Sequence, residues 1–346
     1  MVYGMMEPEA TPKQSINANV GGDSLVHLGV DLGGTGIKVG LVDDEGKLLG
    51  SLSVPTNLPR PAQAICEDIV NVAAQLLEQE KISWEQVEDL GAGAPGTVNP
   101  DEGIVIHAVN LGWWDFPLRE ELTRLLPREI PVYVHNDANV AAAGEYLVGS
   151  AKGAASAVVL TIGTGIGSGI ILNHRIESGH YYGGGEFGHM VIVQGGRPCN
   201  CGRKGCFEAY ASATGLIRLT QEEMERSPES LMHSIAAKQG KVSGRTAFDA
   251  MRAGDEVGKR VVDLFLDYLA CGIANIINAL QPEMICIGGG ISKEGDTLLK
   301  PLTEKVNREL YGGSQRPTTR LQICTLGNDA GMIGAAMLGR MQKAEN

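Results

Sequence analysis

The sequence predicts an α/β protein built from two similar domains with a cleft between them. Two patterns occur once in each half of the chain. An apolar strand, a glycine-rich turn and a second strand occupy 25–42 and again 157–172. A strand, an Asn-Asp-Ala sequence and a helix of small residues occupy 132–147 and again 321–338. Such spaced repetition indicates two copies of one structural unit. Clefts between domains are favoured ligand sites.

The elements of the first half follow from hydrophobic periodicity. Three strands are predicted between 29 and 54, a helix over about 61–81, and a strand over 87–94. Extended pieces at 104–108 and 131–134 follow, and the second runs into an alanine-rich helix that ends near 147. The predicted domains are 25–150 and 151–346. The polar, proline-containing residues 1–24 are expected to be disordered.

The second half begins with strands over 157–162 and 169–172 that flank a glycine turn. A cysteine-rich segment at 186–208 precedes several helices, of which 256–280 is the longest. A short strand over 283–287 ends in three glycines, and a helix over 297–310 and a strand over 321–326 follow. The final helix, 329–344, can pack back on the first domain.

Composition excludes several functional classes. The chain has 346 residues, of which 43% are hydrophobic and 20% charged, so it can bury a substantial core. A net charge of -12 argues against nucleic acid as a partner, because phosphate binding needs clustered Lys and Arg. Neither a signal peptide nor an apolar run of the roughly 18–20 residues that span a membrane is apparent. We therefore expect a cytoplasmic protein without a membrane or nucleic-acid partner.

The first glycine turn, within Gly29–Lys38, has the residues of a phosphate-binding loop. Gly33 and Gly34 allow backbone amides to approach a bulky anion, and Thr35 adds a hydroxyl donor. Lys38 can add positive charge, and the Asp31 carboxylate can hold a phosphate-bound Mg²⁺. An ordinary β-hairpin is the alternative interpretation.

A second glycine stretch, 91–96, matches the dinucleotide fingerprint Gly-x-Gly-x-x-Gly. We reject that match because 97–103 has the composition of a turn, whereas the fingerprint requires a helix there. No P-loop sequence occurs anywhere in the chain.

The two Asn-Asp-Ala sequences are predicted to begin helices, where an Asp side chain commonly caps free amides. A carboxylate at the edge of a cleft can instead act as a general base on a substrate hydroxyl. Asp137 is the better candidate for this base because polar residues surround it in sequence: His135, Asn136 and Asn139. Asp329 is interpreted as a structural cap.

One imidazole and three thiols suggest a structural zinc site. Seven is an odd number of cysteines, and three of them lie within eight residues, which favours a metal site in a reducing compartment over a disulfide framework. The predicted ligands are His189, Cys199, Cys201 and Cys206, which form a Cys₃His set, and a closed set of four ligands leaves no position for catalysis. Buried free thiols are the alternative.

Two glutamates flank these predicted ligands. Glu186 and Glu208 can accept hydrogen bonds from sugar hydroxyls, and His189 can offer its second ring nitrogen to a ligand hydroxyl. The alternative is that both glutamates are solvated surface charges.

Together these motifs resemble the ROK family (repressors, open reading frames, kinases), and within it the bacterial glucokinases. The resemblance rests on Asp-Leu-Gly-Gly-Thr at 31–35, Asn-Asp at 136–137, Glu-Phe-Gly-His at 186–189 and the cysteine run at 199–208. It extends from about 25 to 338. It implies the actin-like, sugar-kinase (ribonuclease H-like) fold of two α/β domains around a cleft, usually assembled as a homodimer or homotetramer.

The resemblance also implies a role for each matching residue. Asp137 would be the catalytic base. The hexose would contact Asn136, Asp137, Glu186, His189 and Glu208, and a structural Zn²⁺ would bind His189, Cys199, Cys201 and Cys206. The phosphates of Mg-ATP would face Asp31, Gly33, Gly34, Thr35 and Lys38 and also Gly163, Thr164, Gly165 and Gly167, and the adenosine would lie beside Gly288, Gly289 and Gly290.

The implied reaction is ATP-dependent phosphorylation of a hexose, D-glucose to glucose 6-phosphate. Overall likeness favours glucose over N-acetylmannosamine, fructose or allose, and the donor is either ATP or polyphosphate. A non-catalytic sugar sensor is a further alternative. The family's repressors carry a winged helix-turn-helix before the kinase-like part, and the 24 polar residues at the start of this chain are too few for one.

Overall fold

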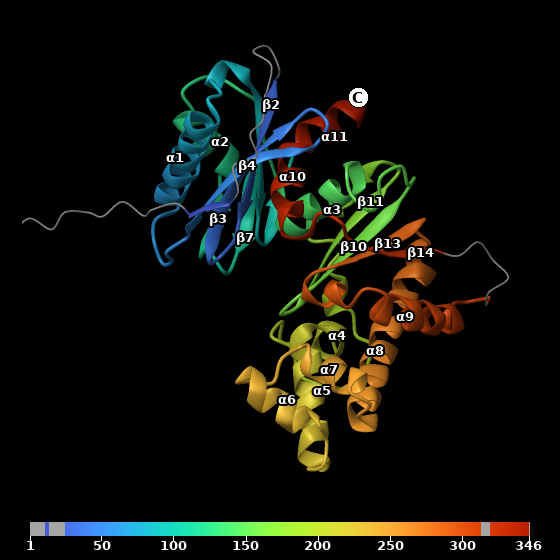
Figure 1. Ribbon diagram of the computed structural model, residues 1–346. Coiled ribbons are helices and arrows are strands. Elements are labelled where there is room, and N and C mark those ends of the chain that lie inside the picture. Colours follow the sequence, from blue (N-terminus) through green and yellow to red (C-terminus); the bar gives the residue numbers. More distant parts are fainter. Residues whose placement is uncertain (1–10, 14–24, 313–318, 346) are drawn as a thin grey trace, which may run out of the picture. The chain divides into compact units, whose positions relative to one another are not determined.

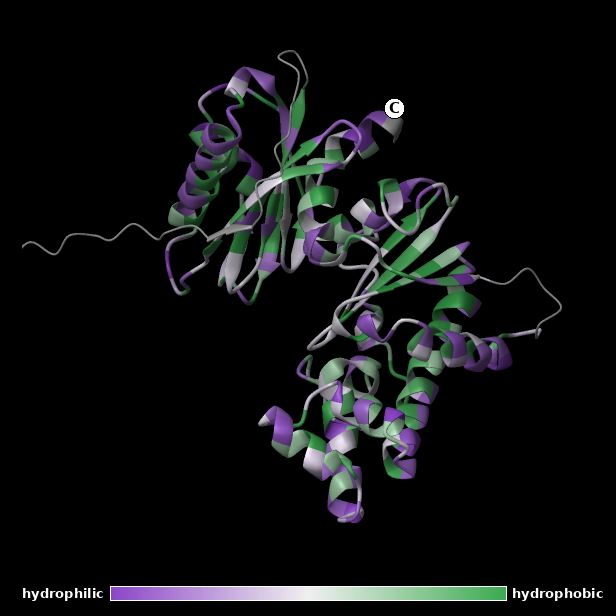
Figure 2. Ribbon diagram, viewed as in Figure 1, coloured by the Kyte–Doolittle hydropathy of each residue, from purple (hydrophilic) through white to green (hydrophobic). Residues whose placement is uncertain are grey.

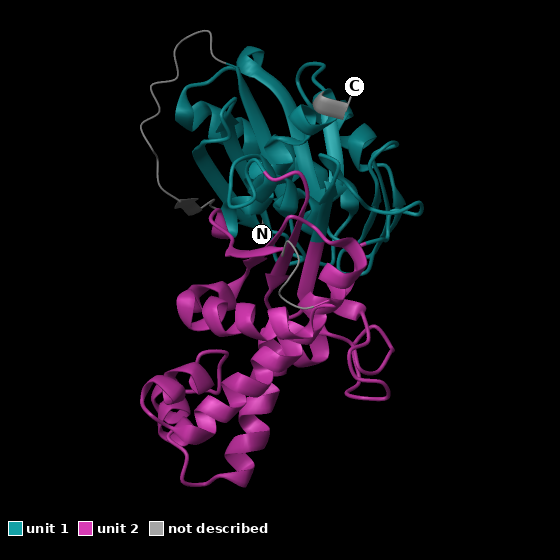
Figure 3. Ribbon diagram, turned by 90° about the vertical axis from the view of Figure 1, so that its right-hand side faces the viewer, with its two compact units in different colours: residues 1–153, 169–184, 328–346 teal, residues 154–168, 185–327 magenta. Residues whose placement is uncertain are grey.

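The computed structural model describes residues 11–13, 25–312 and 319–345. The chain divides into two compact units (Figure 3). Unit 1 contains residues 1–153, 169–184 and 328–346, and unit 2 contains residues 154–168 and 185–327. The C-terminal residues thus belong to the same unit as the first strands of the chain.

Unit 1 is built on a six-stranded sheet in the order β1-β4-β3-β2-β5-β9 (Figure 1). Its strands are β2 (Val26–Leu32), β3 (Gly36–Asp43), β4 (Leu48–Pro55), β5 (Val87–Ala94), β9 (Val132–Asn136) and the short β1 (Thr11–Lys13). β2, β5 and β9 run parallel. β1 pairs antiparallel with β4 although 1–24 was expected to be disordered, and the rest of that segment lies outside the described residues.

Helices cover both faces of this sheet. One face carries α1 (Ala62–Glu80) and α2 (Leu118–Leu125), and the other carries α3 (Asp137–Leu147) and α10 (Ala330–Ala336), which α11 (Leu338–Glu345) follows (Figure 1). α1 buries Ile65, Ile69, Val72 and Leu76, which recur at helical spacing. A short 3-10 turn, η1 (Trp84–Gln86), leads from α1 into β5.

The glycines of β2 and β5 allow α10 to approach the sheet closely. A Cβ atom on Gly29 would lie 1.9 Å from the carbonyl oxygen of Met332, and one on Gly91 would lie 1.8 Å from that of Ala335. Any side chain at these two positions would therefore displace α10. The small residues of α10 meet the same requirement from the helix side.

A small antiparallel sheet lies in the segment between β5 and α2. Its strands are β6 (Thr97–Asn99), β7 (Ile104–Ala108) and β8 (Trp113–Phe116). The sequence predicted a turn at 97–103, and that prediction was wrong for the residues in β6. Three- and four-residue strands give too few alternations for periodicity to detect.

Unit 2 contains three parallel strands, β10 (Ala157–Ile162), β13 (Met284–Gly288) and β14 (Arg320–Ile323). Apolar residues dominate β10 and β13 (Figure 2). The strand β11 (Ile166–Leu172) has its first residues in unit 2 and its last residues in unit 1. These last residues pair with β12 (Arg175–Ile176), which also belongs to unit 1.

The other elements of unit 2 are helical. They are η2 (Phe187–His189), α4 (Glu208–Ala211), α5 (Ala213–Arg226), α6 (Met232–Gln239), α7 (Thr246–Arg252), α8 (Glu256–Leu280), η3 (Gly290–Glu294) and α9 (Asp296–Glu309). The 3-10 turn η5 (Gly327–Asp329) leads into α10.

The central helix of unit 2, α8, is apolar over most of its length. Among the described residues, α8 is the one helix that is long and apolar enough to cross a membrane. No apolar run of that length was apparent in the sequence. However, 61% of its most apolar window is buried inside the fold, where Phe265, Leu269 and Ile273 are part of the core. Its apolar character is therefore that of a core helix.

Candidate active site

The predicted phosphate, magnesium and base residues of unit 1 lie at one edge of its main sheet. Asp31 of β2 is level with Gly93 of β5, and Gly93 is level with His135 of β9. The three strands are parallel, so the residues that follow them, including Gly33 and Asp137, emerge at the same edge. Open α/β sheets bind ligands outside the carboxyl ends of their strands.

The first glycine turn connects two antiparallel strands as a β-hairpin. The Gly33 amide donates to the Gly36 carbonyl at 2.9 Å. Thr56 fixes the turn from the side, because its hydroxyl donates to the Gly33 carbonyl at 2.7 Å and its amide to the Thr35 carbonyl at 3.2 Å. Thr35 itself is exposed. The turn is a hairpin with a fixed backbone and an accessible Thr35 side chain, so it can still receive a phosphate.

The two charged residues of this turn form an ion pair. Lys38 Nζ donates to Asp31 Oδ2 at 2.7 Å, and the two residues are opposite each other in the β2–β3 ladder. Asp31 also lies against the chain near the start of α10, where a Cβ on Gly331 would be 3.0 Å from its Cγ. The proposed magnesium ligand is therefore held in place by a cation on one side and by backbone on the other.

The side chain that caps α3 is that of Asn136. Its Oδ1 accepts from the amides of Ala138 at 3.0 Å and Asn139 at 3.1 Å, and its Nδ2 donates to the Gly96 carbonyl at 2.9 Å. Asp137 is the first residue of the helix, and its Oδ1 accepts from the Ala138 amide at 2.8 Å. Capping by Asn136 leaves Asp137 at the positive end of the helix, where a carboxylate is stabilised.

The expected cap in the second Asn-Asp-Ala sequence is absent. α10 begins at Ala330 directly after η5, and the Asp329 side chain accepts no capping hydrogen bond. The backbone of Asp329 is helical, whereas a capping residue normally has extended dihedral angles. The interpretation of Asp329 as a structural cap was therefore wrong.

His135 anchors the start of α3 from inside the sheet. It is buried, and its Nδ1 accepts from the Asn136 amide at 2.9 Å, so the ring proton must be on Nε2. Asn139 Nδ2 lies 3.3 Å from the same nitrogen. Burial lowers the pKa of His135 to about 4, so the ring is neutral near pH 7.

In unit 2, the second glycine turn and the glycines after β13 also lie at one sheet edge. Thr161 of β10 is level with Gly288 of β13, so the segments that follow both strands emerge together. Gly289 has a φ of 83°, and a Cβ there would lie 2.3 Å from the Ile162 carbonyl oxygen. Gly290 faces open space. Both glycine segments that were expected to contact nucleotide thus meet at the carboxyl ends of parallel strands.

Hydrogen bonds from the cysteine-rich region and from α5 hold the second glycine turn. The Ala213 amide donates to the Gly163 carbonyl at 2.9 Å, and the Thr214 hydroxyl donates to the Thr164 carbonyl at 2.8 Å. The Ile166 amide donates to Glu208 Oε2 at 3.2 Å. The backbone of this turn is therefore fixed by residues forty or more positions later in the chain.

The predicted zinc ligands come together in unit 2. The ligand atoms of His189, Cys199, Cys201 and Cys206 all lie within 4.8 Å of one another. Two of these separations are 3.6 Å: Cys201 Sγ to Cys206 Sγ, and Cys199 Sγ to His189 Nδ1. Two ligands of a tetrahedral zinc lie about 3.6–3.8 Å apart, given bond lengths of about 2.0–2.3 Å. The spacing and chemistry of these four groups fit a Cys₃His zinc site.

Glu208 is not the solvated surface charge that was one interpretation of it. Its side chain is 19% exposed. Oε2 accepts from Ile166, and Oε1 accepts from the Cys199 thiol at 3.2 Å and lies 3.7 Å from His189 Nδ1. Glu186 is exposed, which agrees with a solvated surface charge and also with a side chain that contacts a ligand. Glu208 thus joins the cysteine cluster to the second glycine turn.

Comparison with known proteins identifies the family of the chain. The family model "ROK family" matches residues 27–342. The chain belongs to the ROK family. A relative from Halalkalibacterium halodurans named glucokinase is 40% identical over 92% of this chain and 96% of its own. The N-acetyl-D-glucosamine kinase of Yersinia pseudotuberculosis is 28% identical over 92% of this chain and all of its own.

The ROK fold is also found in solved structures. A ROK family glucokinase from Streptomyces griseus, crystallised with glucose and AMPPNP, superposes with a TM-score of 0.75. It is 34% identical and covers 91% of this chain and 99% of its own. The actin-like, sugar-kinase fold predicted from the sequence is therefore confirmed.

Some residues near these sites carried no signal in the sequence. Asn110 lies beside the first glycine turn, where a Cβ on Gly34 would be 3.5 Å from the Asn110 Cβ. Thr214 and Arg218 of α5 line a pocket with Thr164. Their proximity depends on tertiary contacts, and only the capping residue Ser212 could have located the start of α5 in advance.

Proposed function

We propose that this protein transfers the γ-phosphoryl group of ATP to D-glucose and releases glucose 6-phosphate. The observation that carries the proposal is the 40% identity, over nearly the whole of both chains, to a glucokinase. The likeness to a glucokinase structure with glucose and an ATP analogue supports it. Glucose is favoured over other hexoses because identity to the N-acetyl-D-glucosamine kinase is lower, at 28%.

Asp137 is proposed as the general base. It would accept the proton of the sugar hydroxyl that attacks the phosphoryl group. Asn136, which fixes the start of α3, has one amide hydrogen left for a sugar hydroxyl after its bond to Gly96. Phosphoryl transfer needs mainly orientation and charge neutralisation, so a fixed carboxylate at the end of a strand is sufficient.

The two glycine turns are proposed to face the phosphates of Mg-ATP. Mg²⁺ prefers oxygen ligands and neutralises phosphate charge when bound, and the Asp31 carboxylate suits it. Lys38, now paired with Asp31, would then be able to contact a phosphate oxygen. The adenosine is proposed to lie beside Gly288, Gly289 and Gly290, where Gly290 leaves open space.

The sugar and zinc roles are proposed together for the 186–208 segment. Glu186, His189 and Glu208 would bind sugar hydroxyls. His189 would use Nδ1, which faces the cysteine cluster, for zinc and leave Nε2 for the sugar. The zinc would be structural, because its four protein ligands complete a tetrahedral site.

The test is a panel of hexoses with Mg-ATP or polyphosphate as donor, assayed with the wild type and Asp137→Asn. We expect turnover of glucose with ATP, and a loss of kcat of about 10²–10⁴-fold in the variant, as for removal of a general base. Glucose binding measured by calorimetry should stay within a few fold.

Two variants control for other effects of the substitution. Asp296→Asn removes a carboxylate from the first position of another helix, α9, and should leave kcat unchanged. Asp329→Asn tests whether the aspartate of the second Asn-Asp-Ala sequence also contributes to turnover. An active Asp137→Asn enzyme would remove Asp137 as the base. Binding of sugar by a wild type that phosphorylates none would instead indicate a sensor.

We further propose a cytoplasmic homodimer or homotetramer. The cysteine count is odd, at seven, and three of the seven form one cluster, as expected for a metal site in a reducing compartment. Light scattering coupled to size exclusion would measure the assembly, and a monomer at micromolar concentration would contradict it.

A further inference from the structure

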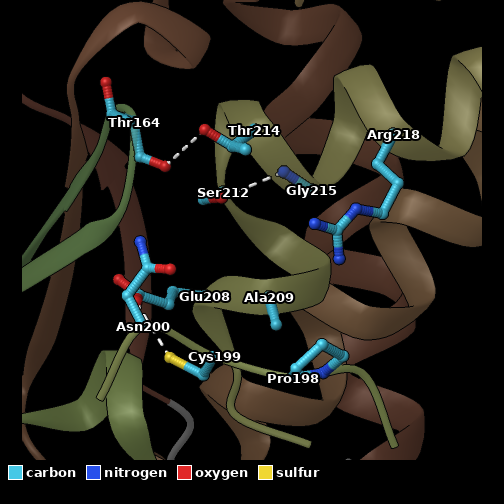
Figure 4. A pocket seen from close by; sticks show the side chains of 10 residues that line it. All are labelled: Thr164, Pro198, Cys199, Asn200, Glu208, Ala209, Ser212, Thr214, Gly215 and Arg218. Atoms are coloured by element: carbon cyan, nitrogen blue, oxygen red, sulfur yellow. Dashed lines mark hydrogen bonds between the residues drawn. The ribbon is translucent and has the colours of Figure 1, made fainter. Parts of the chain in front are cut away.

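A small pocket of unit 2 lies beside the second glycine turn. Its volume is about 120 Å³. Thr164 of the turn forms one side, and the first turns of α5, with Thr214 and Arg218, form the other (Figure 4). Thr214 and Arg218 are four residues apart and so share one face of the helix. None of the roles assigned above uses Arg218.

The Arg218 side chain is available to a ligand. Its guanidinium group points into the pocket (Figure 4). Within the part of the chain that the structure describes, Arg218 forms no ion pair, whereas Arg226 of the same helix pairs with Glu223 at 2.6 Å. The acidic residue of the pocket, Glu208, has both oxygens in use by Ile166 and Cys199.

The start of α5 adds a second donor to this pocket. Ser212 caps the helix by accepting from the Gly215 amide at 3.1 Å, and the Ala213 amide donates to Gly163. The Thr214 amide has no acceptor among the described residues. A helix N-terminus, a free amide and a guanidinium group together favour an anion with several oxygens, of which phosphate is the common biological example.

We propose that Arg218 binds a phosphate group of the nucleotide and holds it against Thr164. This rests on the proposed function, in which the second glycine turn faces the phosphates of ATP. A nucleotide is the expected source because the Thr214 hydroxyl binds the Thr164 carbonyl directly, so the pocket and the turn are contiguous. A sugar phosphate has the same chemistry and is distinguished by the test.

The test measures the Kd values of ADP, ATP, adenosine and glucose 6-phosphate by calorimetry with the full chain. Arg218→Gln should weaken ADP and ATP by about tenfold or more, as expected for loss of a charge-assisted hydrogen bond. Adenosine, which lacks phosphate, should bind both proteins equally. Arg218→Lys should be intermediate because it keeps the charge and loses the planar fork. Arg226→Gln is the control and should bind like the wild type.

Each other outcome has a distinct meaning. Unchanged ADP binding by a folded Arg218→Gln protein, or an equal loss for adenosine, would overturn the proposal while leaving the proposed function intact. A loss confined to glucose 6-phosphate would overturn it in favour of a product site. Failure of the wild type to bind ADP or ATP would overturn both the proposal and the proposed function.

Discussion

The pKa values of two buried histidines of unit 1 shift in opposite directions. Burial lowers the pKa of His135 to about 4, and its nearest polar contacts, from the Asn136 amide and the Asn139 side chain, require a neutral ring nitrogen. Burial also lowers the pKa of His27, but hydrogen bonds from its ring to Asp89 and Asp44 outweigh burial, and the pKa is raised overall. One site therefore favours the neutral ring and the other the charged ring.

These directions predict opposite pH profiles for two variants. The contribution of His135 to stability is full above its unfolded pKa of about 6.5 and is lost as the pH falls toward 4, a change of about 3 kcal/mol. The contribution of His27 is full below about 6.5 and is lost as the pH rises through its folded pKa. Urea unfolding between pH 4 and 8 of the wild type, His135→Gln and His27→Gln measures both.

The stability difference between the wild type and His135→Gln should shrink toward low pH, and that for His27→Gln should grow. Each variant serves as the control for the other, because both replace a buried imidazole of unit 1. Parallel stability curves for the wild type and His135→Gln would show that this imidazole does not titrate with folding.

At the scale of elements, one glycine of the second glycine turn lies directly against the Glu208 side chain. A Cβ on Gly165 would lie 2.4 Å from Glu208 Oε2, whereas a Cβ on Gly163 would meet nothing within 4 Å. Neither residue has a positive φ, so backbone strain does not separate them. A methyl group at Gly165 would therefore displace the Glu208 carboxylate, whereas one at Gly163 would displace nothing.

Gly165→Ala should displace the Glu208 carboxylate from the Ile166 amide and lower the free energy of unfolding by about 2 kcal/mol, the usual value for a hydrogen bond to a charged group. Gly163→Ala should be neutral or slightly stabilising because alanine restricts the unfolded chain. Urea unfolding without ligand compares the two variants. Equal stabilities would mean that Glu208 moves aside at no cost.

The same scale shows what the sequence could predict. The sequence placed β5 at 87–94 and α8 at 256–280, because long elements repeat their apolar period several times. The clustering of one imidazole and three thiols in the sequence predicted the Cys₃His set, and the four ligand atoms lie within 4.8 Å of one another. The bond from Ile166 to Glu208 joins residues 42 positions apart, and the sequence places no constraint on such a pair. The cap at Asn136 was missed because Asn and Asp cap equally well.

At the scale of the whole molecule, zinc bound at the proposed site should stabilise the folded structure of one region of unit 2. The cluster joins His189 to three cysteines. Two of its neighbours, Glu208 and Gly188, contact Ile166 at the end of the second glycine turn. A Cβ on Gly188 would lie 2.3 Å from the Ile166 carbonyl oxygen, so the two backbones are in contact. Because metal binding energy is folding energy, removing the metal should destabilise this whole region.

We therefore expect Cys201→Ser to lose zinc and to exchange amide hydrogens faster at 163–168 and 186–215. A local loss of about 2 kcal/mol corresponds to roughly thirtyfold faster exchange. The strands β2, β5 and β9 of unit 1 should exchange as in the wild type, since none contains a residue of the cluster. Mass spectrometry measures both the exchange and the metal content.

Cys271→Ser, a cysteine of α8 outside the cluster, is the matched control and should keep its zinc. Unchanged metal content in Cys201→Ser would remove the zinc assignment. Faster exchange spread evenly over both units would show that the metal supports the fold as a whole, because a local role predicts a change confined to the cluster and the turn that it holds.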